Sequence, residues 1–458
     1  MRVLFIRPNM SPHRSSDALE PVVFGILSAL TPPEIERQLC DERLEPIPFE
    51  APADLVAITV ETFTARRAYQ IAAKFLRRGV PVVMGGYHPT LRPDEALRFA
   101  SAVVVGDAEG VWPDVLADTQ HGRLQRIYRR PLPPLAGLAV DRSLFRGKRY
   151  RRVALVQFGR GCKYACDFCS IHAFYGTSLR WRPVDEVVAE LESVRGRHVF
   201  FTDDNLFNDR GQLELLLAAI APLGARWSCQ ASLDVAADPN LVRRMARAGC
   251  VAAMIGFESL DDNNLSQMRK LWHRRYGPYD ELVQVFRNEG IMVYGGFVLG
   301  YDHDTPDAFQ ITLDFALRNK LFLANFNPLA PTPGAKIYDR LQSEGRLIHD
   351  PWWLHDDYRY GQSMFHPRQM TAEQLMAGCY QARSEFNRCG NIVRRAIDRQ
   401  ANCRDLYRAG AFFAANLTSR REIHNKQGRR LGDESELTPV FEALADPGML
   451  QDAVAADM

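Results

Sequence analysis

Three cysteines stand close together in the stretch GRGCKYACDFCS, residues 159–170. They are Cys162, Cys166 and Cys169, with the spacing CxxxCxxC. Thiolates bind zinc and iron–sulfur clusters, and both kinds of centre ordinarily take four ligands. The three thiols therefore raise the question of what fills the fourth position.

Zinc is one interpretation, because His172 follows Cys169 by three residues and completes a Cys3His set. All four ligands would then lie in one short loop, whereas zinc sites usually separate two ligand pairs by a longer spacer. A chance group of buried cysteines is a second interpretation. It is disfavoured because Lys163, Tyr164 and Asp167 between the cysteines are not typical core residues.

An iron–sulfur cubane is the third interpretation. Such a cluster ordinarily has four thiolate ligands, so three leave one iron open to a substrate or cofactor. The chain has nine cysteines, an odd number, which favours metal chemistry in a reducing compartment over a disulfide framework. We therefore expect a cytoplasmic protein.

The cysteine loop follows the first of six strand-like segments. These lie at 153–158, 197–202, 226–230, 251–257, 291–299 and 322–328. Helix-length patterns such as residues 183–194 separate them. Six β/α repeats predict an α/β fold with an open or partial (β/α)6 barrel of the TIM type.

With the aromatic Phe168 before its last cysteine, the loop resembles the signature of radical S-adenosylmethionine (SAM) enzymes. The resemblance implies that Cys162, Cys166 and Cys169 bind a 4Fe–4S cluster whose fourth iron chelates S-adenosylmethionine. Reduction of the sulfonium then releases a 5′-deoxyadenosyl radical. The three cysteines are thus expected to be both metal ligands and catalytic residues, supplied with electrons by a donor such as flavodoxin or ferredoxin.

Polar residues and glycines at later strand ends agree with this resemblance. Carboxylates follow the second strand, where the family contacts the methionine ammonium. An acidic motif after the fourth strand looks like the family's ribose-binding motif, and a glycine motif in the fifth resembles its adenine-side motif. The cofactor-binding residues implied are Phe168, Asp203, Asp204, Glu258, Ser259, Gly296 and Gly300.

The first ~130 residues also alternate short apolar runs with helical patterns, which predicts a parallel sheet. The strand-like segments are 3–6, 39–47, 55–60, 80–86 and 102–106, and residues 65–78 form a helical pattern. Continuous Val/Ile/Leu runs are typical of strands buried on both faces. Ligands of such Rossmann-like sheets lie beyond the carboxyl ends of the strands.

This α/β region, with a Gly-Gly pair after its fourth strand and a radical domain behind it, resembles the cobalamin-binding class. That class includes hopanoid C-2 methylases and bacteriochlorophyll enzymes. The resemblance implies cobalamin contacts from Glu61, Thr62, Gly85, Gly86 and Gly106. The DxHxxG motif of other cobalamin proteins is absent, and Arg7-Pro8-Asn9 stands where it would begin. We therefore expect cobalt without a protein histidine ligand and His13 as a surface residue.

We predict four regions. They are a cobalamin-binding domain at 1–130, a proline-rich linker at 131–150, the radical domain at 151–340 and a helical C-terminal region at 341–458. In the last region a helix from Thr371 places Leu375, Cys379, Ala382 and Phe386 on one face. The final ~30 residues are charged or small, and we expect them to be poorly packed.

Composition excludes several classes of protein. The 458 residues carry a net charge of +2 without a dominant basic block, which argues against a nucleic-acid binder. No apolar stretch is long enough for a transmembrane segment, and the N-terminus lacks a secretory pattern.

Together, these patterns predict a cobalamin-dependent radical methyltransferase that acts on an unactivated carbon of a lipid, tetrapyrrole or natural-product scaffold. A C–H bond without acidity cannot be deprotonated by a side chain near neutral pH, so a radical must remove the hydrogen atom. The alternatives are a non-methylating ring closure or oxidation by the same architecture, and a non-enzymatic iron–sulfur redox sensor.

Overall fold

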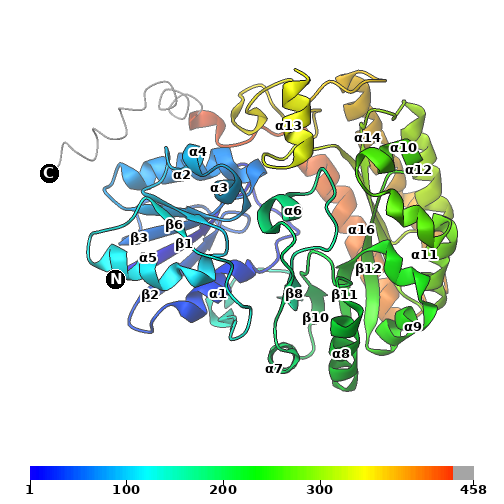
Figure 1. Cartoon of the computed structure of the whole chain (residues 1–458), viewed down its shortest axis with the longest axis horizontal. Coiled ribbons are helices and arrows are strands. Elements are labelled where there is room, and N and C mark those ends of the chain that lie inside the picture. Colours follow the sequence, from blue (N-terminus) through cyan, green and yellow to red (C-terminus); the bar gives the residue numbers. More distant parts are fainter. Residues whose placement is uncertain (437–458) are drawn as a thin grey trace.

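A computed structural model describes residues 1–436 and contains two six-stranded parallel sheets with helices around them. In Figure 1 the first sheet, drawn in blue and cyan, lies beside the second, drawn mainly in green, with helix α6 between them. The α/β class and the two parallel sheets confirm the sequence prediction at that level.

The first sheet has the strand order β2-β1-β3-β4-β5-β6. Its strands are β1 Arg2–Arg7, β2 Glu36–Asp41, β3 Leu55–Thr59, β4 Val82–Gly85, β5 Ala102–Val105 and β6 Ile127–Arg129. The sequence analysis predicted five strands in this sheet, and the structure has a sixth, β6. This strand was missed because it has only three residues and lies next to the proline-rich connector. The order reverses between β1 and β3, where ligands of such sheets bind.

Helices cover both faces of this sheet. Helices α1 (Val22–Leu30) and α5 (Trp112–Gln120) pack on one face, and α2 (Ala65–Leu76) packs on the other. Two short helices, α3 (Tyr87–Leu91) and α4 (Pro93–Ala96), follow β4. Both faces are therefore buried, as the continuous apolar runs predicted.

The second sheet adds its strands in chain order, which confirms all six predicted segments. They are β7 Val153–Val156, β10 His198–Phe201, β11 Trp227–Ala231, β12 Cys250–Glu258, β13 Met292–Leu299 and β14 Leu323–Pro328. A small hairpin of β8 (Gly159–Arg160) and β9 (Arg180–Trp181) brackets α6 (Ser170–Tyr175). Outer helices are α7 Val184–Ser193, α8 Arg210–Ile220, α9 Pro239–Arg247, α10 Asp262–Gln267, α11 Tyr279–Asn288 and α12 Asp307–Arg318.

Side chains alternate between the two faces of the second sheet. Ala253, Ile255 and Phe257 of β12 lie in the core beneath the outer helices. On the opposite face, Ala252 packs with Phe412 of the long helix α16 (Leu406–Lys426). Helix α16 therefore covers the amino-terminal part of the inner face and leaves the carboxyl ends of the strands to the site.

The C-terminal region returns to the first sheet. Helices α13 (Lys336–Ser343), α14 (Ala372–Phe386) and α15 (Cys389–Ala396) precede α16, and α14 has the predicted cap and buried face. Trp352, Trp353 and Leu431 lie in the same apolar cluster as α2. The N–H of Gly432 donates to the Met10 carbonyl at 2.7 Å. The expectation of poor packing is thus wrong for residues 429–433, and the part of it that concerns 437–458 falls outside the described residues.

Candidate active site

The three cysteines lie in the loop between β8 and α6, beyond the carboxyl end of β7. Cys166 is buried, Cys162 and Cys169 are half-buried, and none forms a disulfide. Burial raises the pKa of all three thiols, that of Cys166 to about 12. A bound metal would reverse this effect, because a coordinating thiol is deprotonated outright. The donor set therefore fits a cluster held by three thiolates.

A Cys3His zinc site is not supported by the geometry. The Nδ1 atom of His172 lies 3.1 Å from the Gly176 carbonyl oxygen, within hydrogen-bond distance. Across residues 1–436, no three His, Cys, Asp or Glu side chains are placed around a single ion position. A cubane does not need that arrangement, because each thiolate binds a different iron.

A buried carboxylate, Asp203, and a half-buried one, Asp204, lie just beyond β10 and hold the backbone that leads into the cysteine loop. Asp203 accepts the N–H groups of Phe158 (3.0 Å) and Gly159, and Asp204 accepts that of Gly161 at 2.8 Å. Burial raises the pKa of both carboxyls, that of Asp203 to about 7. Asp203 thus orients the loop, and its two oxygens are already engaged. Contact of Asp203 or Asp204 with the methionine ammonium stays a prediction.

Glu258 ends β12 with a left-handed backbone at φ +64°. The register with β13 shifts between Gly256 and Glu258. A Cβ at Gly256 would lie 2.1 Å from Glu258 Oε1, so glycine leaves the room that this carboxylate occupies. Strained backbone of this kind clusters at functional sites.

Lys270 pairs with this carboxylate and was missed by the sequence analysis. Its Nζ atom lies 2.8 Å from Glu258 Oε1, and the residue is 8% exposed. Burial alone would lower the pKa of the ammonium, but the Glu258 carboxylate reverses this and leaves the pKa above its ordinary value. Lys270 lies beside the cysteine loop, since the Asp167 N–H donates to the carbonyl of Met268, two residues before Lys270, at 3.3 Å. No pattern in the sequence distinguishes it from neighbouring basic residues.

The glycine motif at the end of β13 reaches the cysteine loop through its next residue. Tyr301 donates its hydroxyl hydrogen to Asp167 Oδ1 at 2.7 Å. Asp167 is 8% exposed, so the expectation that it is not a core residue is wrong. Gly300, with φ +102°, starts the turn, and a Cβ there would meet Leu375 at 2.6 Å. Gly300 is therefore required for the turn, and Tyr301 makes the hydrogen bond to the cysteine loop.

Three further residues were predicted to contact S-adenosylmethionine. Two of them are packed within the protein, and one borders open space. Phe168 packs, partly buried, on the core of the second sheet. Ser259 is 5% exposed and accepts the Asp261 N–H at 3.1 Å, which starts α10. Gly296 faces the inner side, where a Cβ would have no neighbour closer than 3.7 Å. Of these three, only Gly296 leaves room for a ligand.

At the carboxyl edge of the first sheet, the predicted cobalamin contacts also differ in character. Glu61 is exposed and pairs with Arg7 at 3.1 Å. Thr62 is buried, and its Oγ1 lies 3.3 Å from Nδ1 of the fully buried His88. Thr62 therefore has a structural role whatever it binds. His88 also lies 3.0 Å from Glu95, within a buried polar group that sequence analysis did not find.

The three glycines of this edge are not equivalent. Gly86 has φ +105°, and a Cβ there would lie 2.9 Å from the Val60 carbonyl oxygen. Gly106 has φ +92°, and its N–H donates to Thr90 Oγ1 at 3.0 Å. Gly85 has an ordinary backbone, and a Cβ would meet only Val104 at 3.6 Å. Of the three glycines, Gly85 therefore agrees best with the interpretation that a ligand approaches the backbone closely.

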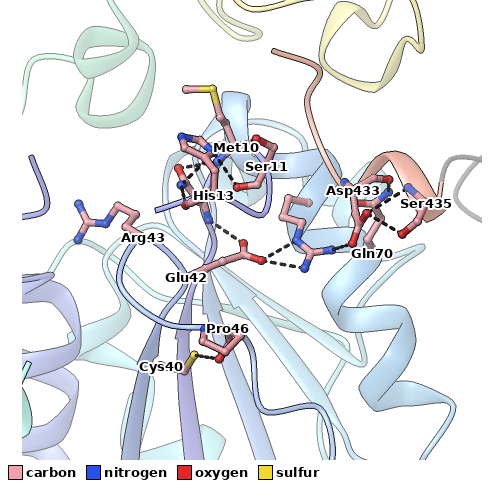
Figure 2. Close-up of polar contacts among 12 residues, drawn as sticks. Met10, Ser11, His13, Cys40, Glu42, Arg43, Pro46, Gln70, Asp433 and Ser435 are labelled. Carbon is pink, nitrogen blue, oxygen red and sulfur yellow. Dashed lines mark hydrogen bonds and ion pairs between the residues drawn. The ribbon is translucent and has the colours of Figure 1, made fainter. Parts of the chain in front are cut away.

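The loop after β1 is held by a buried ion pair (Figure 2). Glu42 accepts the Asn9 N–H at 3.0 Å and two N–H groups of Arg67 at 2.9 and 2.8 Å. His13 was expected to be a surface residue, but it is half-buried, and its Nδ1 atom lies 2.9 Å from Ser11 Oγ. Its Nε2 atom is buried without a hydrogen-bond partner in the described chain. Burial lowers the pKa of His13.

The carboxyl edges of the two sheets meet through α3 and α6. Tyr87, directly after the glycine pair, packs its ring 4.9 Å from Phe174 of α6. Burial raises the pKa of Tyr87 well above its ordinary value, and Asp204 and Cys169 add to this shift. The predicted cobalamin edge therefore lies against the cysteine loop.

An ion network secures this contact. Asp107, which follows Gly106, pairs with Arg160 at 2.9 Å and Arg180 at 2.8 Å and accepts the Tyr175 hydroxyl at 3.1 Å. Arg160 also pairs with Glu109 at 2.6 Å. Arg160 precedes Cys162 by two residues, so the network links the two sheets at the site itself.

Comparison with known proteins defines the class. Residues 156–316 match the Radical SAM superfamily. Bacteriochlorophyllide d C-12(1)-methyltransferase of Chlorobaculum tepidum is 30% identical over 76% of this chain and 78% of its own length. Hopanoid C-2 methylase of Rhodopseudomonas palustris is 27% identical over 71% of this chain and 64% of its own. The chain belongs to the radical SAM enzymes, in the family of the bacteriochlorophyllide methyltransferases.

Solved structures support the fold. The radical S-adenosylmethionine methyltransferase TsrM from Kitasatospora setae, with cobalamin and a 4Fe–4S cluster bound, is similar with a TM-score of 0.60. The identity is 18%, and 75% of each chain is covered. The cobalamin-dependent radical enzyme OxsB is similar with a TM-score of 0.60 at 13% identity, over 100% of this chain and 80% of its own. Membership of the superfamily makes the 4Fe–4S cluster and S-adenosylmethionine the cofactors of this enzyme.

Within residues 1–436, no helix has the length and apolarity that crossing a bilayer requires.

Proposed function

We propose that this enzyme uses cobalamin and S-adenosylmethionine to methylate an unactivated carbon. The observation that carries the proposal is the contact between the two carboxyl edges. The glycine pair after β4 and the cysteine loop after β7 face each other through Tyr87 and Phe174. Two cofactors bound at these edges would share one space, which methyl transfer between them requires.

When bound, the cluster, S-adenosylmethionine and cobalamin supply the radical and the methyl group, and the chain supplies binding and orientation. Asp203 and Tyr301 hold the cysteine loop in place. Glu258 is positioned to accept hydroxyls of a ribose, and the open side of Gly296 fits an adenine. Tyr87 of α3 and Phe174 of α6 pack against each other between the two edges.

We assign residues 1–130 to cobalamin binding, 131–150 to a linker, 151–340 to a partial barrel and 341–458 to a C-terminal region. Relatives named for bacteriochlorophyllide d and for hopanoids support a tetrapyrrole or lipid substrate, and a natural-product scaffold fits the same class. We further infer a cytoplasmic enzyme that has no nucleic-acid partner and receives electrons from a flavodoxin or ferredoxin.

A non-methylating reaction is the second candidate. The anaerobic magnesium-protoporphyrin IX monomethyl ester cyclase of Rubrivivax gelatinosus is 23% identical over 62% of this chain and 57% of its own. Its name describes a ring closure, so chains similar to this one include an enzyme named for a reaction other than methylation. The non-enzymatic redox sensor is contradicted by membership of an enzyme family.

The metal centre is tested first. Protein reconstituted anaerobically should hold about four irons per chain, as a cubane requires. Replacing Cys162, Cys166 and Cys169 with Ala should abolish the visible absorption of the cluster. Cys229→Ala and Cys250→Ala are matched controls, because both thiols are buried within the second sheet. Retention of the absorption by the triple variant would overturn the assignment.

Cobalamin is tested separately. Protein purified with cobalamin supplied should give a cobalt(II) spin-resonance spectrum without nitrogen splitting, because we expect neither a protein histidine nor the base of the cobalamin tail on the cobalt. His13→Ala should leave the spectrum unchanged. Nitrogen splitting that disappears in this variant would show that His13 binds cobalt and would refute the proposed ligation.

A further inference from the structure

Helices α15 and α16 expose an unusual group of apolar side chains. Five large hydrophobic residues that are at least 41% exposed lie between positions 393 and 417. They are Val393 at 57%, Ile397 at 71%, Leu406 at 93%, Phe413 at 41% and Leu417 at 57%. Single exposed apolar residues are normal on a protein surface, whereas a group of them indicates an interaction site. We call this group the α15–α16 patch.

Helical periodicity places these residues on the outward faces of the two helices. Leu406, Phe413 and Leu417 are seven and four residues apart, which puts them on one side of α16. Phe412 and Asn416 lie about 100° around the helix from this stripe and are fully buried against the second sheet. Val393 of α15 and Ile397, the C-cap residue directly after this helix, are four residues apart, and the two helices contact each other. The outward stripe of α16 is therefore apolar where a surface helix is ordinarily polar.

The same segment is strongly basic, so the expectation that the chain has no dominant basic block is wrong for this segment. Residues 388–421 contain eight arginines and two aspartates, and no lysine or glutamate. Both aspartates are already paired, Asp398 with Arg287 and Asp405 with Arg408. The arginines exposed around the patch are Arg388, Arg394, Arg399, Arg404, Arg420 and Arg421. Arg388 pairs with Glu385 at 3.6 Å, whereas no ion pair of the other five arginines is found in the described chain, so their positive charge surrounds the apolar stripe.

The combination of exposed apolar side chains and arginines indicates what kind of partner binds the α15–α16 patch. A second copy of the chain would bring arginines against arginines, which costs free energy. A neutral apolar partner would not use the arginines. An anionic bilayer surface satisfies both features, because apolar side chains enter the boundary of headgroups and acyl chains while guanidinium groups bind lipid phosphates. We propose that the α15–α16 patch docks this enzyme on a membrane surface rich in anionic lipid.

The orientation is compatible with catalysis. Tyr407 of α16 lies 2.8 Å from His198, the first residue of β10, and Arg408 donates to the Gly290 carbonyl just before β13. The patch is therefore at the amino-terminal ends of the strands, and the cysteine loop lies beyond the carboxyl ends. In Figure 1 α16, drawn in orange, runs behind the strands of the second sheet. Docking through this face leaves the site uncovered and does not depend on the proposed reaction.

The test is sedimentation of the full chain with vesicles. One preparation is phosphatidylcholine alone, and the other is an equal mixture of phosphatidylcholine and phosphatidylglycerol. We expect binding to the anionic vesicles only, with loss at high salt because exposed charges are screened. The variant L406S/F413S/L417S should weaken binding about tenfold or more, since it removes three side chains from the apolar contact. The variant R394Q/R399Q/R421Q should abolish the preference for anionic lipid.

A matched control replaces two apolar residues on other helices, L215S/I311S, which are 59% and 56% exposed. This control should bind vesicles like the unaltered chain. Equal loss in the control and the patch variant, or no binding to either vesicle, would overturn the proposal. Self-association that disappears in L406S/F413S/L417S, without vesicle binding by the unaltered chain, would instead assign the patch to a second copy.

Discussion

The ammonium of Lys270 and the carboxylate of Glu258 form a 2.8 Å ion pair beside the cysteine loop. The carboxylate reaches this position only because Gly256 lacks a side chain and because Glu258 adopts a left-handed backbone. The pair leaves the second carboxylate oxygen available to a ligand.

Glu258→Gln should therefore weaken S-adenosylmethionine binding while the cluster absorption stays unchanged. A charged hydrogen bond to a ribose hydroxyl contributes about 1.5–3 kcal/mol, which corresponds to a roughly ten- to hundredfold loss of affinity. Calorimetric titration of the reconstituted protein measures it. The double variant E258Q/K270M removes the unpaired ammonium and should recover stability without recovering affinity. Unchanged affinity in Glu258→Gln would exclude this residue from the nucleoside site.

The ion network between the two sheets should be important for stability. Asp107→Asn removes the carboxylate that Arg160 and Arg180 share in a buried place, and breaking such a pair costs about 3–5 kcal/mol. Urea titration of the free energy of unfolding measures the loss. Arg130→Gln is the control, because it breaks an exposed pair with Asp114, and such pairs contribute about 0–1 kcal/mol. Equal midpoints for the two variants would contradict the structural role of Asp107.

The glycine pair permits a sharper comparison. Gly86→Ala forces a side chain onto a left-handed backbone against the Val60 carbonyl and should cost about 1–3 kcal/mol of stability. Gly85→Ala meets no such contact, so its stability should hardly change. If Gly85 allows a close approach of cobalamin, this variant should retain less cobalamin per chain after gel filtration. Full retention by a stable Gly85→Ala protein would remove Gly85 from the ligand edge.

His198 should make the stability of the fold depend on pH. Burial lowers its pKa to about 4, whereas an exposed histidine titrates near 6.5. Between these values the unfolded chain binds more protons than the folded chain, so stability falls as the pH decreases from about 6.5 to about 4. His198→Asn should flatten this part of the profile, measured by urea titration at several pH values. A profile identical to that of the unaltered chain would show that His198 does not contribute.

The sequence predicts most of the fold because its signals are local. Strand-like segments fall on eleven of the twelve strands of the two sheets, although the one expected at 39–47 overlaps β2 (Glu36–Asp41) only at residues 39–41, and the spacing of Leu375 and Cys379 marks α14. The missed strand, β6, has only three residues and lies directly before the prolines, so its pairing with β5 has no local signal.

The site was less predictable where contacts join distant segments. The cysteine motif is contiguous and was found, but Tyr301, which binds Asp167 in the motif, follows β13, and Lys270, which pairs with Glu258, follows α10. Asp167 was expected to lie outside the core, because nothing in the sequence around it indicates the hydrogen bond from Tyr301. The packing of residues 429–433 likewise depends on Met10 and Gln70, more than 360 residues away.

The most direct test of the proposed function is the transfer of a methyl group to cobalamin without substrate. Reconstituted protein is incubated anaerobically with S-adenosylmethionine and a strong reductant, with and without bound cobalamin, and both nucleoside products are quantified. The proposal predicts S-adenosylhomocysteine in proportion to bound cobalamin and none in its absence. Formation of 5′-deoxyadenosine without any cobalamin-dependent S-adenosylhomocysteine would contradict it and favour a radical enzyme that does not methylate.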